Sequence, residues 1–399
     1  MLRAGSIGVS YVINVCKNLF SSSENDTLNS KSKKLQTLKK TLESYGGMLA
    51  KIAQMLAYGD NSDSVFSDCK PYSRDKTHNY VKQYIKENTD IPFTIIPVIH
   101  KSGTIGQVYL GEYKKTKVVL KVLYVGLDKQ TESDIQVVDL IGNFLYGSVK
   151  IKEALNEVRD KIVEELDFRI ESKNHFTMYE LWNGVDYASV PCIYPELTKK
   201  NMIVTEYVDG LHLGDFIKTA SQDIKNQLSF NIVRFMYTNI YIHKILYSDC
   251  HNGNFIVTNK DNKLKLNVID FGCLHHVSQN TYKCLKKIHK SLKKKDKEKF
   301  FKYVTKLGLL HDKVSPESKE YLYETFYLSH QPWIEEKEFH FTKEWISKIE
   351  DKKMNFIQEW NIPKEMVYFN KIPYGLFHIL VSLNAKGKFF EIFNSILTE

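Results

Sequence analysis

The sequence predicts an α+β protein with two lobes, a small β-rich lobe followed by a mainly helical one. Three segments rich in β-branched and aromatic residues follow one another closely at 94–99, 108–113 and 117–124. From about residue 281 onward, apolar residues recur mostly at helical spacing. A chain of 399 residues is also too long for one minimal hydrophobic core and long enough for two.

The composition is that of a globular chain with excess positive charge. Hydrophobic residues make up 43% and charged residues 26%, which excludes wholesale disorder and a collagen-like repeat. The formal net charge of +9 favours anionic partners, and nucleotides, nucleic acid and acidic lipid head groups all qualify. Six cysteines are scattered without a C-x-x-C pair, so we expect no zinc site, no disulfide framework and a reducing intracellular compartment. No run of roughly 18 apolar residues is present, so we expect no ordinary membrane span.

We expect four consecutive parts along the chain. They are an N-terminal segment and linker (1–34), N-terminal helices (35–90), a small lobe of β-sheet plus helices (91–208), and a mainly helical large lobe with a C-terminal extension (209–399). Further β-type segments are predicted at 201–207, 255–258 and 265–269, and long helical patterns at 151–182 and 211–246.

Two short motifs in the large lobe carry the residue types that phosphoryl transfer requires. Asp249 and Asn254 are five residues apart on a loop that enters a strand, and Asp270 ends the next strand within Ile-Asp-Phe-Gly. A carboxylate at Asp249 would orient the attacking hydroxyl or water, while Asn254 and Asp270 would hold Mg²⁺ against phosphate oxygens. This combined spacing is far more specific than a lone Asp-Phe-Gly, and it disfavours the alternative of two ordinary Asx-rich turns.

A glycine-containing loop and a strand lysine lie upstream of these motifs. Gly103 and Gly106 occur between two predicted strands, where glycine lets backbone N–H groups approach phosphates closely. Lys121 follows in an apolar strand and would bind the α- and β-phosphates. An ammonium group among apolar neighbours needs a carboxylate partner, and a later helical segment offers Glu164, Glu165, Asp167 and Glu171.

In their order along the chain, these pieces resemble the UbiB family, the aarF-domain-containing (ADCK) kinases, which are atypical members of the protein-kinase-like fold. Lys51-Ile-Ala-Gln54 resembles the family's K-x-G-Q motif, and 104–108 resembles the end of its nucleotide loop. Residues 165–174 resemble its E-L-D-Y-x-x-E-A-x-N helix, and 248–254 resemble H-A-D-P-H-P-G-N. The resemblance covers roughly residues 35–290.

The resemblance implies a bilobal protein-kinase-like fold with an N-terminal helical extension over the active site. It implies ATP and Mg²⁺ as cofactors and a pair between Lys121 and Glu171 at the phosphates. The nucleotide-binding residues that it implies are Gly103, Thr104, Gly106, Gln107, Lys121, Glu206 and Val208. Lys51 would be a second cation near the phosphates, accompanied by the family-motif residues Gln54, Glu165 and Asp167.

Some positions depart from the family's pattern. Ala53 stands in place of the glycine of K-x-G-Q, and Lys101-Ser102-Gly103 replaces an alanine tract. Tyr247 replaces the histidine that precedes the catalytic aspartate. Because the residues implied in phosphate and metal binding are intact, we expect an active enzyme in preference to a pseudokinase.

We therefore expect an ATP-dependent phosphotransferase or ATPase whose acceptor is water or a small or lipid-like molecule, and the resemblance implies a role in ubiquinone or lipid metabolism. One alternative is a small-metabolite kinase of the choline- or aminoglycoside-kinase type, against which Lys51-Ile-Ala-Gln54 argues. Another is a nucleotide-gated scaffold without turnover.

A lysine-rich segment, 283–299, carries apolar residues at helical spacing. It predicts either an exposed helix of the large lobe or an amphipathic helix lying on an anionic membrane. No recognised nucleic-acid-binding motif is present, so we expect no nucleic-acid partner.

Overall fold

The computed structural model describes residues 74–87, 93–102, 105–125, 164–261, 263–311, 313–356, 360 and 363–398. Their contacts divide them into two compact units. Unit 1 comprises the described residues up to Lys173 together with Cys192–Tyr207, and unit 2 comprises Asn174–Pro191 and the described residues from Val208 onward. We expected 91–208 to form one small lobe, but the structure assigns 174–191 to the second unit.

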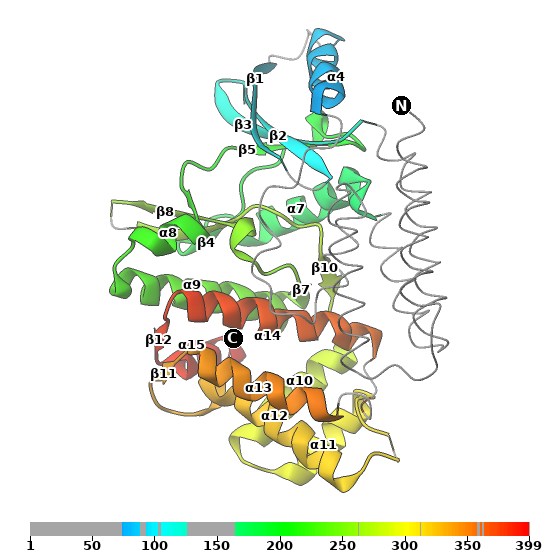
Figure 1. Cartoon of the computed structure of the whole chain (residues 1–399), viewed down its shortest axis with the longest axis vertical. Coiled ribbons are helices and arrows are strands. Elements are labelled where there is room, and N and C mark those ends of the chain that lie inside the picture. Colours follow the sequence, from blue (N-terminus) through cyan, green and yellow to red (C-terminus); the bar gives the residue numbers. More distant parts are fainter. Residues whose placement is uncertain are drawn as a thin grey trace, which may run out of the picture. The chain divides into compact units, whose positions relative to one another are not determined.

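Unit 1 is built on a four-stranded antiparallel sheet in the order β1-β2-β3-β5 (Figure 1). Its strands confirm the predicted β-type segments: β1 (Phe93–Ser102), β2 (Gly106–Tyr113), β3 (Thr116–Leu123) and β5 (Met202–Glu206). The turn between β2 and β3 is Lys114-Lys115, with φ of 46° and 67°, as in a primed two-residue hairpin turn. Helix α4 (Arg74–Glu87) contributes Val81 to the apolar core of this sheet, and a 3₁₀ turn, η2 (Pro195–Leu197), precedes β5.

Helix α7 (Phe168–Trp182) begins in unit 1 and ends in unit 2. Phe168 packs with Leu123, Ile193 and Ile203 in unit 1, whereas Met178 and Trp182 belong to the main apolar core of unit 2. The short strand β4 (Ala188–Ser189), which follows α7, pairs with a strand of unit 2. These contacts explain why 174–191 belongs to unit 2.

Unit 2 contains short sheets that position its two motifs. A four-stranded sheet has the order β4-β9-β8-β6, with β6 (Leu211–His212), β8 (Phe255–Lys260) and β9 (Lys263–Val268). Strands β8 and β9 confirm the predicted β-type segments 255–258 and 265–269 and form a hairpin, in which Phe255 pairs with Val268. This register places Asn254, just before β8, beside Ile269, whose N–H donates to the Asn254 carbonyl at 3.1 Å. Asp270, which follows Ile269 in the chain, is therefore close to Asn254 in space.

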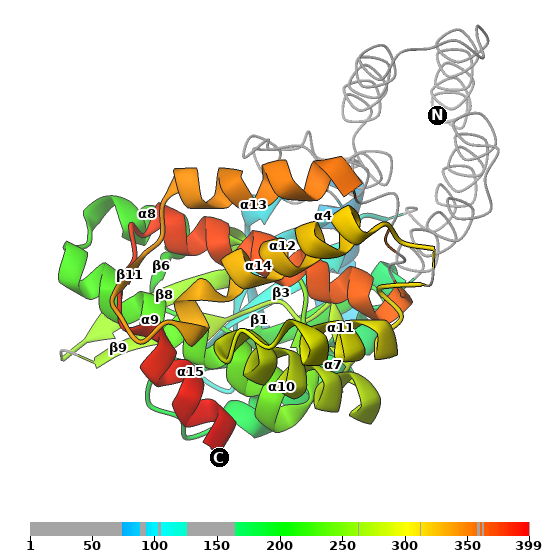
Figure 2. The same ribbon diagram turned by 90° about the horizontal axis from the view of Figure 1, so that it is seen from below.

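The remaining elements of unit 2 are mainly helices, as the sequence predicts. They are α8 (Leu213–Thr219), α9 (Gln222–Thr238), α10 (Gln279–Lys293), α11 (Lys297–Lys306), α12 (Pro316–Ile334), α13 (Lys343–Phe356), α14 (Lys364–Ser382) and α15 (Phe389–Thr398) (Figure 2). The side chains of Ser278, Asp296 and Ser315 cap α10, α11 and α12 by accepting a backbone N–H. Two-stranded sheets pair β7 (Ile245–Tyr247) with β10 (Leu274–His276) and β11 (Phe339–His340) with β12 (Lys386–Gly387).

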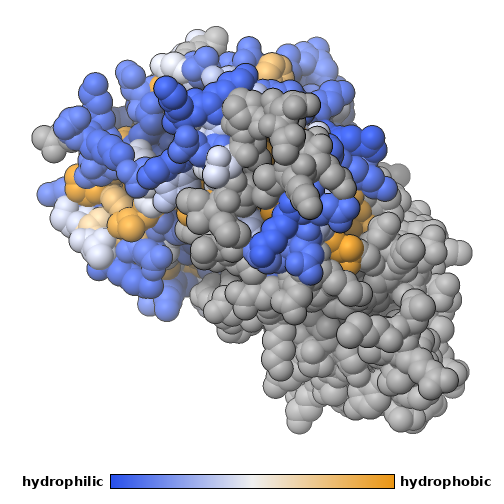
Figure 3. Space-filling view, turned by 90° about the horizontal axis from the view of Figure 1, so that it is seen from above, coloured by the Kyte–Doolittle hydropathy of each residue, from blue (hydrophilic) through white to orange (hydrophobic). Residues whose placement is uncertain are grey.

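The surface of the described residues shows little exposed apolar area. In the described part of the chain, the exposed large apolar side chains are Ile170, Phe176 and Leu211. The face in Figure 3 is correspondingly hydrophilic over most of its coloured area, with small scattered hydrophobic spots. Among the described residues, none of the helices has the length and hydropathy needed to cross a membrane.

Candidate active site

The strand lysine and the helix glutamate of unit 1 form a direct ion pair. Lys121 lies in β3, opposite Val108 and Ile203, and its Nζ is 3.0 and 3.1 Å from the two carboxylate oxygens of Glu171. Glu171 lies in the first turn of α7, where the helix dipole favours a carboxylate. The side chain of Glu171 is 10% exposed and that of Lys121 30% exposed. The ammonium group is therefore held in place and still open to an anionic ligand.

Two residues predicted to lie in the nucleotide loop, Gly106 and Gln107, have structural roles in the sheet. A Cβ atom at Gly106 would lie 2.4 Å from the carbonyl oxygen of Val122, so only glycine allows β2 and β3 to pair there. Gln107 is fully buried, and its Oε1 accepts a 2.6 Å hydrogen bond from the Tyr109 hydroxyl. Gly103 and Thr104 lie outside the described residues.

The acidic residues before α7 differ in their surroundings. Arg169 donates to Asp167 through its backbone N–H at 3.1 Å and through its guanidinium at 2.8 and 2.6 Å. The hydrogen bond from the Arg169 side chain is the main reason that the pKa of Asp167 is lowered. Asp167 therefore stabilises the start of α7. Glu165 is half-buried in the preceding turn, and its expected companions Lys51 and Gln54 lie outside the described residues.

The segment expected to bind adenine lies at the end of β5. The backbone N–H of Glu206 donates to the Cys192 carbonyl at 2.7 Å, so this group is already used within unit 1. The Glu206 side chain is exposed. Among the described residues, no group accepts a hydrogen bond from the N–H of Val208.

In unit 2, residues 248–254, called the catalytic loop after their expected role, are organised by a side-chain hydrogen bond between two predicted site residues. The Nδ2 amide of Asn254 donates to Asp249 twice, to the backbone carbonyl at 2.9 Å and to Oδ2 at 3.0 Å. Because the amide nitrogen faces Asp249, the Oδ1 atom of Asn254 is directed elsewhere and can bind a cation. Asp270 uses its Oδ1 to accept the N–H of Gly272 at 3.0 Å, which closes the Asp-Phe-Gly turn.

His251 is a further member of the catalytic loop. Its Nδ1 accepts the backbone N–H of Gly253 at 3.1 Å, so in this neutral ring the proton is on Nε2. That Nε2 lies 3.4 Å from Oδ2 of Asp249. The imidazole is thus oriented with its N–H toward the carboxylate and helps to fix the position of Asp249.

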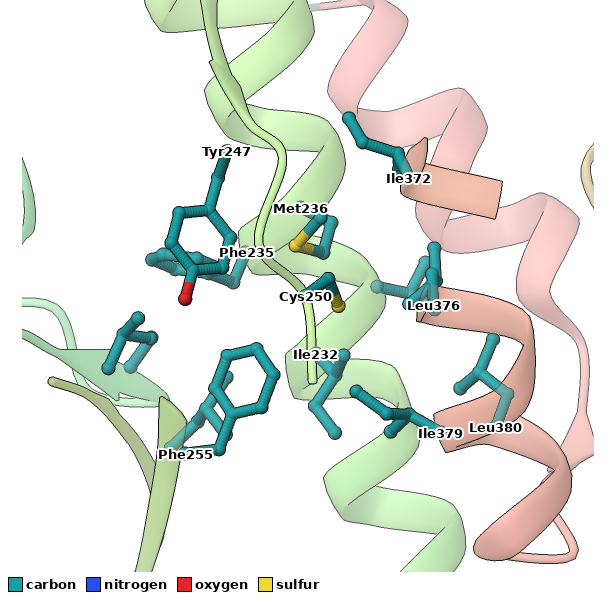
Figure 4. Packing of buried hydrophobic residues seen from close by; sticks show 14 of the residues in the cluster. Ile232, Phe235, Met236, Tyr247, Cys250, Phe255, Ile372, Leu376, Ile379 and Leu380 are labelled. Carbon is teal, nitrogen blue, oxygen red and sulfur yellow. The ribbon is translucent and has the colours of Figure 1, made fainter. Parts of the chain in front are cut away.

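Tyr247 fills the position where the resemblance leads us to expect histidine. Its ring centroid lies 5.9 Å from Phe235 and Phe271 and 6.2 Å from Phe255, and the residue is 1% exposed (Figure 4). Burial, and secondarily the charges of Asp249 and Asp270, raise the pKa of Tyr247 well above its usual value. The hydroxyl therefore stays neutral, and the ring supports the loop by packing.

Gly375, which was not among the residues expected at the site, lies on α14 directly against the catalytic loop. A Cβ atom there would lie 2.2 Å from the carbonyl oxygen of Cys250. Figure 4 shows Cys250 close to Leu376 of the same helix. Burial raises the pKa of the Cys250 thiol, so this residue acts by packing and not as a thiolate. The sequence feature that could have indicated this close packing is the single glycine within an otherwise apolar helical pattern.

We expect Gly375→Ala to displace the catalytic loop, because the added methyl group would overlap backbone atoms that cannot rotate away. Overpacking of this kind costs about 1–3 kcal/mol in the free energy of unfolding. Thermal unfolding and turnover, measured together, should both decline. The matched control is Gly214→Ala in α8, where an added Cβ meets nothing within 4 Å. Equal behaviour of the two variants would contradict the close contact at Gly375.

The fold and the arrangement of these residues are those of the protein-kinase-like class. Residues 64–304 match the ABC1 atypical kinase-like domain, which is more than half of the chain. The chain therefore belongs to the ABC1 atypical kinase-like family, and the predicted UbiB/ADCK resemblance is confirmed.

Sequence similarity to several atypical kinases supports this assignment. The chain is 26% identical over 260 residues to "Probable serine/threonine-protein kinase abkB" of Dictyostelium discoideum, covering 59% of this chain and 38% of that protein. It is 25% identical over 247 residues to "Atypical kinase COQ8B, mitochondrial" of Rattus norvegicus, covering 58% and 46%. It is 24% identical over 213 residues to "Atypical kinase COQ8, mitochondrial" of Saccharomyces cerevisiae, covering 52% and 42%. The matched region spans less than half of each of these three relatives.

A solved structure supports the fold alone. It is described as "The complex structure of Rv3197-erythromycin from Mycobacterium tuberculosis", with a TM-score of 0.69 and 17% sequence identity. The match covers 92% of this chain and 97% of that chain. The mixed helix-and-sheet, kinase-like fold class that the sequence predicts is thus confirmed.

Proposed function

We propose that this chain binds Mg²⁺-ATP and transfers the terminal phosphoryl group to water or to a small or lipid-like acceptor. The observation that carries the proposal is the hydrogen bond from the Asn254 amide to Asp249, which orients a candidate base and a candidate metal ligand at once. The Lys121–Glu171 pair supports it, since a strand ammonium held by a carboxylate suits the α- and β-phosphates.

The oxygen atoms of unit 2 fit a magnesium ion. Asn254 offers Oδ1 and Asp270 a carboxylate, which are the hard oxygen ligands that Mg²⁺ prefers. No group of three or more His, Cys, Asp or Glu side chains suited to a metal occurs among the described residues. Two protein ligands completed by phosphate oxygens and water are the usual arrangement for Mg²⁺ at a nucleotide site. When bound, the ion would neutralise charge on the phosphate oxygens.

The roles of the chain's own residues follow from their geometry. Asp249 would orient the acceptor hydroxyl or water and receive its proton, because its carboxylate is positioned by Asn254 and His251. Lys121 would bind the phosphates, and Glu171 would keep its ammonium group in place. The N–H of Val208 is proposed to donate to the adenine ring.

A wider role in ubiquinone or lipid metabolism is proposed from the relatives. The matched proteins include those named "Probable protein kinase UbiB" and the COQ8 atypical kinases. The intact Lys121, Glu171, Asp249, Asn254 and Asp270 support an active member of this family.

The proposed function is tested by ADP release from Mg²⁺-ATP with purified protein, alongside the affinity for ATP with and without Mg²⁺. Mg²⁺-dependent ADP release supports the proposal. ATP binding without turnover would favour the nucleotide-gated scaffold, and turnover that appears only when choline or an aminoglycoside is added would favour a small-metabolite kinase. A chain that binds no nucleotide would contradict all three.

We also propose that the lysine-rich surface of α10 and α11 binds anionic lipid head groups. Residues 279–306 contain eleven lysines and two acidic residues, a net charge of +9 that equals the charge of the whole chain. Ten of these lysines are exposed, and three of the ten form ion pairs, with Glu336, Glu320 and Asp296. For the other seven, no acidic side chain of the described part lies within ion-pair range: Lys283, Lys287, Lys290, Lys294, Lys295, Lys302 and Lys306.

The structure limits the form that such binding can take. The apolar residues Cys284, Ile288 and Leu292 of α10 are buried in a cluster with Phe300 and Val304 of α11. The helix is therefore an exposed helix of unit 2, and its apolar face is not available to enter a bilayer. Contact with a membrane would be electrostatic, through lysines that contribute about 1 kcal/mol each near an anionic surface.

Co-sedimentation with phosphatidylserine-containing vesicles tests this surface. We expect binding at low salt, loss of binding at high salt, and a large decrease in the Lys283→Glu/Lys287→Glu/Lys290→Glu variant. The control is a triple charge reversal elsewhere in unit 2, at Lys218, Lys260 and Lys265. Equal losses in the two variants would show that net charge alone is responsible and would contradict a specific surface.

A further inference from the structure

Asn174 makes a hydrogen bond to the loop that carries the candidate metal ligand Asp270. Its Nδ2 amide donates to the backbone carbonyl of Phe271 at 3.0 Å. Phe271 is fully buried and directly follows Asp270 in the chain. A side chain that fixes the carbonyl of Phe271 also restricts the peptide unit next to Asp270, and thus the direction of the Asp270 carboxylate.

His175, the next residue in the chain, contacts the side chain of Phe271 in the same loop. Its ring lies edge-on to the ring of Phe271, with centroids 4.9 Å apart. Its Nε2 is 2.8 Å from the carbonyl oxygen of Pro191, and because a carbonyl only accepts, Nε2 carries the proton. His175 is 1% exposed, so this contact is anchored inside unit 2. Two consecutive residues thus hold the backbone and the ring of Phe271.

The position of Asn174 along α7 gives this contact its significance. Glu171, the partner of Lys121, is three residues earlier on the same helix, and both lie within the continuous segment Phe168–Trp182. Residues three apart are neighbours on one helical face. The helix therefore carries one residue that holds the phosphate-binding lysine and another that holds the metal-binding loop.

We propose that Asn174 is a positioning residue for Asp270. This inference rests on the proposed function for its metal. The amide donor of Asn174 is the essential feature, because the backbone carbonyl of Phe271 accepts its hydrogen bond. Removing it frees the Asp270–Gly272 turn and weakens divalent-metal binding, while metal-free nucleotide binding is retained.

The test compares wild type with Asn174→Asp, which keeps the shape but replaces the donor by a carboxylate oxygen, and with Asn174→Ala, which removes it without adding charge. Glu180→Gln, an exposed change on the same helix, is the control. Hydrogen exchange of the ligand-free protein is followed for the peptide covering 268–275. Mn²⁺ binding is measured by electron paramagnetic resonance with a non-hydrolysable ATP analogue, and nucleotide binding is measured in EDTA.

We expect both Asn174 variants to show faster exchange in this peptide, Mn²⁺ binding weakened about tenfold, as for a lost buried hydrogen bond, and nucleotide affinity in EDTA within twofold of wild type. Unchanged exchange or unchanged Mn²⁺ binding in folded Asn174→Ala would overturn the inference. A wild-type protein that binds no nucleotide contradicts the proposed function instead, and hydrogen exchange alone then decides the role of Asn174.

Discussion

Asp249→Asn is expected to lower the rate of ADP release from Mg²⁺-ATP by about 10²–10⁴-fold, the usual contribution of a positioned general base. The amide cannot accept the proton of the acceptor, although it has nearly the same shape as the carboxylate. Its oxygen can still accept the hydrogen bond from the Asn254 amide, so the loop should stay in place. We therefore expect ATP affinity to remain within about twofold, because Asp249 is not assigned to the nucleotide.

The control for this variant is Asp209→Asn, which removes an exposed carboxylate that pairs with Lys260 in the same unit. Exposed ion pairs contribute little, so turnover should be unchanged in the control. Single-turnover measurements with saturating ATP separate the chemical step from binding. If Asp249→Asn and Asp209→Asn turn over alike, the assignment of the catalytic loop is wrong.

The second large effect is expected at the Lys121–Glu171 pair. Lys121→Met removes the ammonium group, and we expect ATP affinity and turnover to fall together, with turnover lowered about 100-fold or more as for loss of one electrostatic contact in a transition state. The variant should also be less stable, because the carboxylate of Glu171, 10% exposed, loses the two hydrogen bonds that Lys121 donates. Such a loss costs about 1–3 kcal/mol.

A double-mutant cycle tests whether the two residues act as a unit. Glu171→Gln alone should lower turnover because Lys121 loses its ionic partner and its position. In the double variant Lys121→Met/Glu171→Gln, we expect part of the lost stability to return and no further loss of turnover. Chemical unfolding and steady-state kinetics measure the two quantities. Strict additivity of both would contradict the pair.

The strands of unit 1 could be predicted because their information is local. Successive β-branched residues in β3 and the short turn at Lys114-Lys115 predict a hairpin without knowledge of the rest of the chain. The same holds for the β8–β9 hairpin, which brings Asn254 and Asp270 together. Lys121 accordingly lies in β3, while Asn254 directly precedes β8 and Asp270 follows β9.

Other features depend on contacts between distant segments and could not be predicted. Gly375 is 125 positions from Cys250, and nothing local shows that the two backbones touch. The bond from Asn174 to Phe271 spans 97 positions, and Gln107 appears as a loop residue until its buried partner Tyr109 is known. The expected roles of Lys51, Gln54, Gly103 and Thr104 remain predictions, because these residues lie outside the described part of the chain.

The distribution of lysines has a consequence for how the molecule turns in solution. Since residues 279–306 account for the entire formal charge of +9, the rest of the sequence is formally neutral. We expect an anionic surface to attract the chain mainly through this segment, so that encounters begin in a preferred orientation. Added salt should abolish this alignment at long range first, because salt at physiological ionic strength screens charges over a Debye length of about 8 Å.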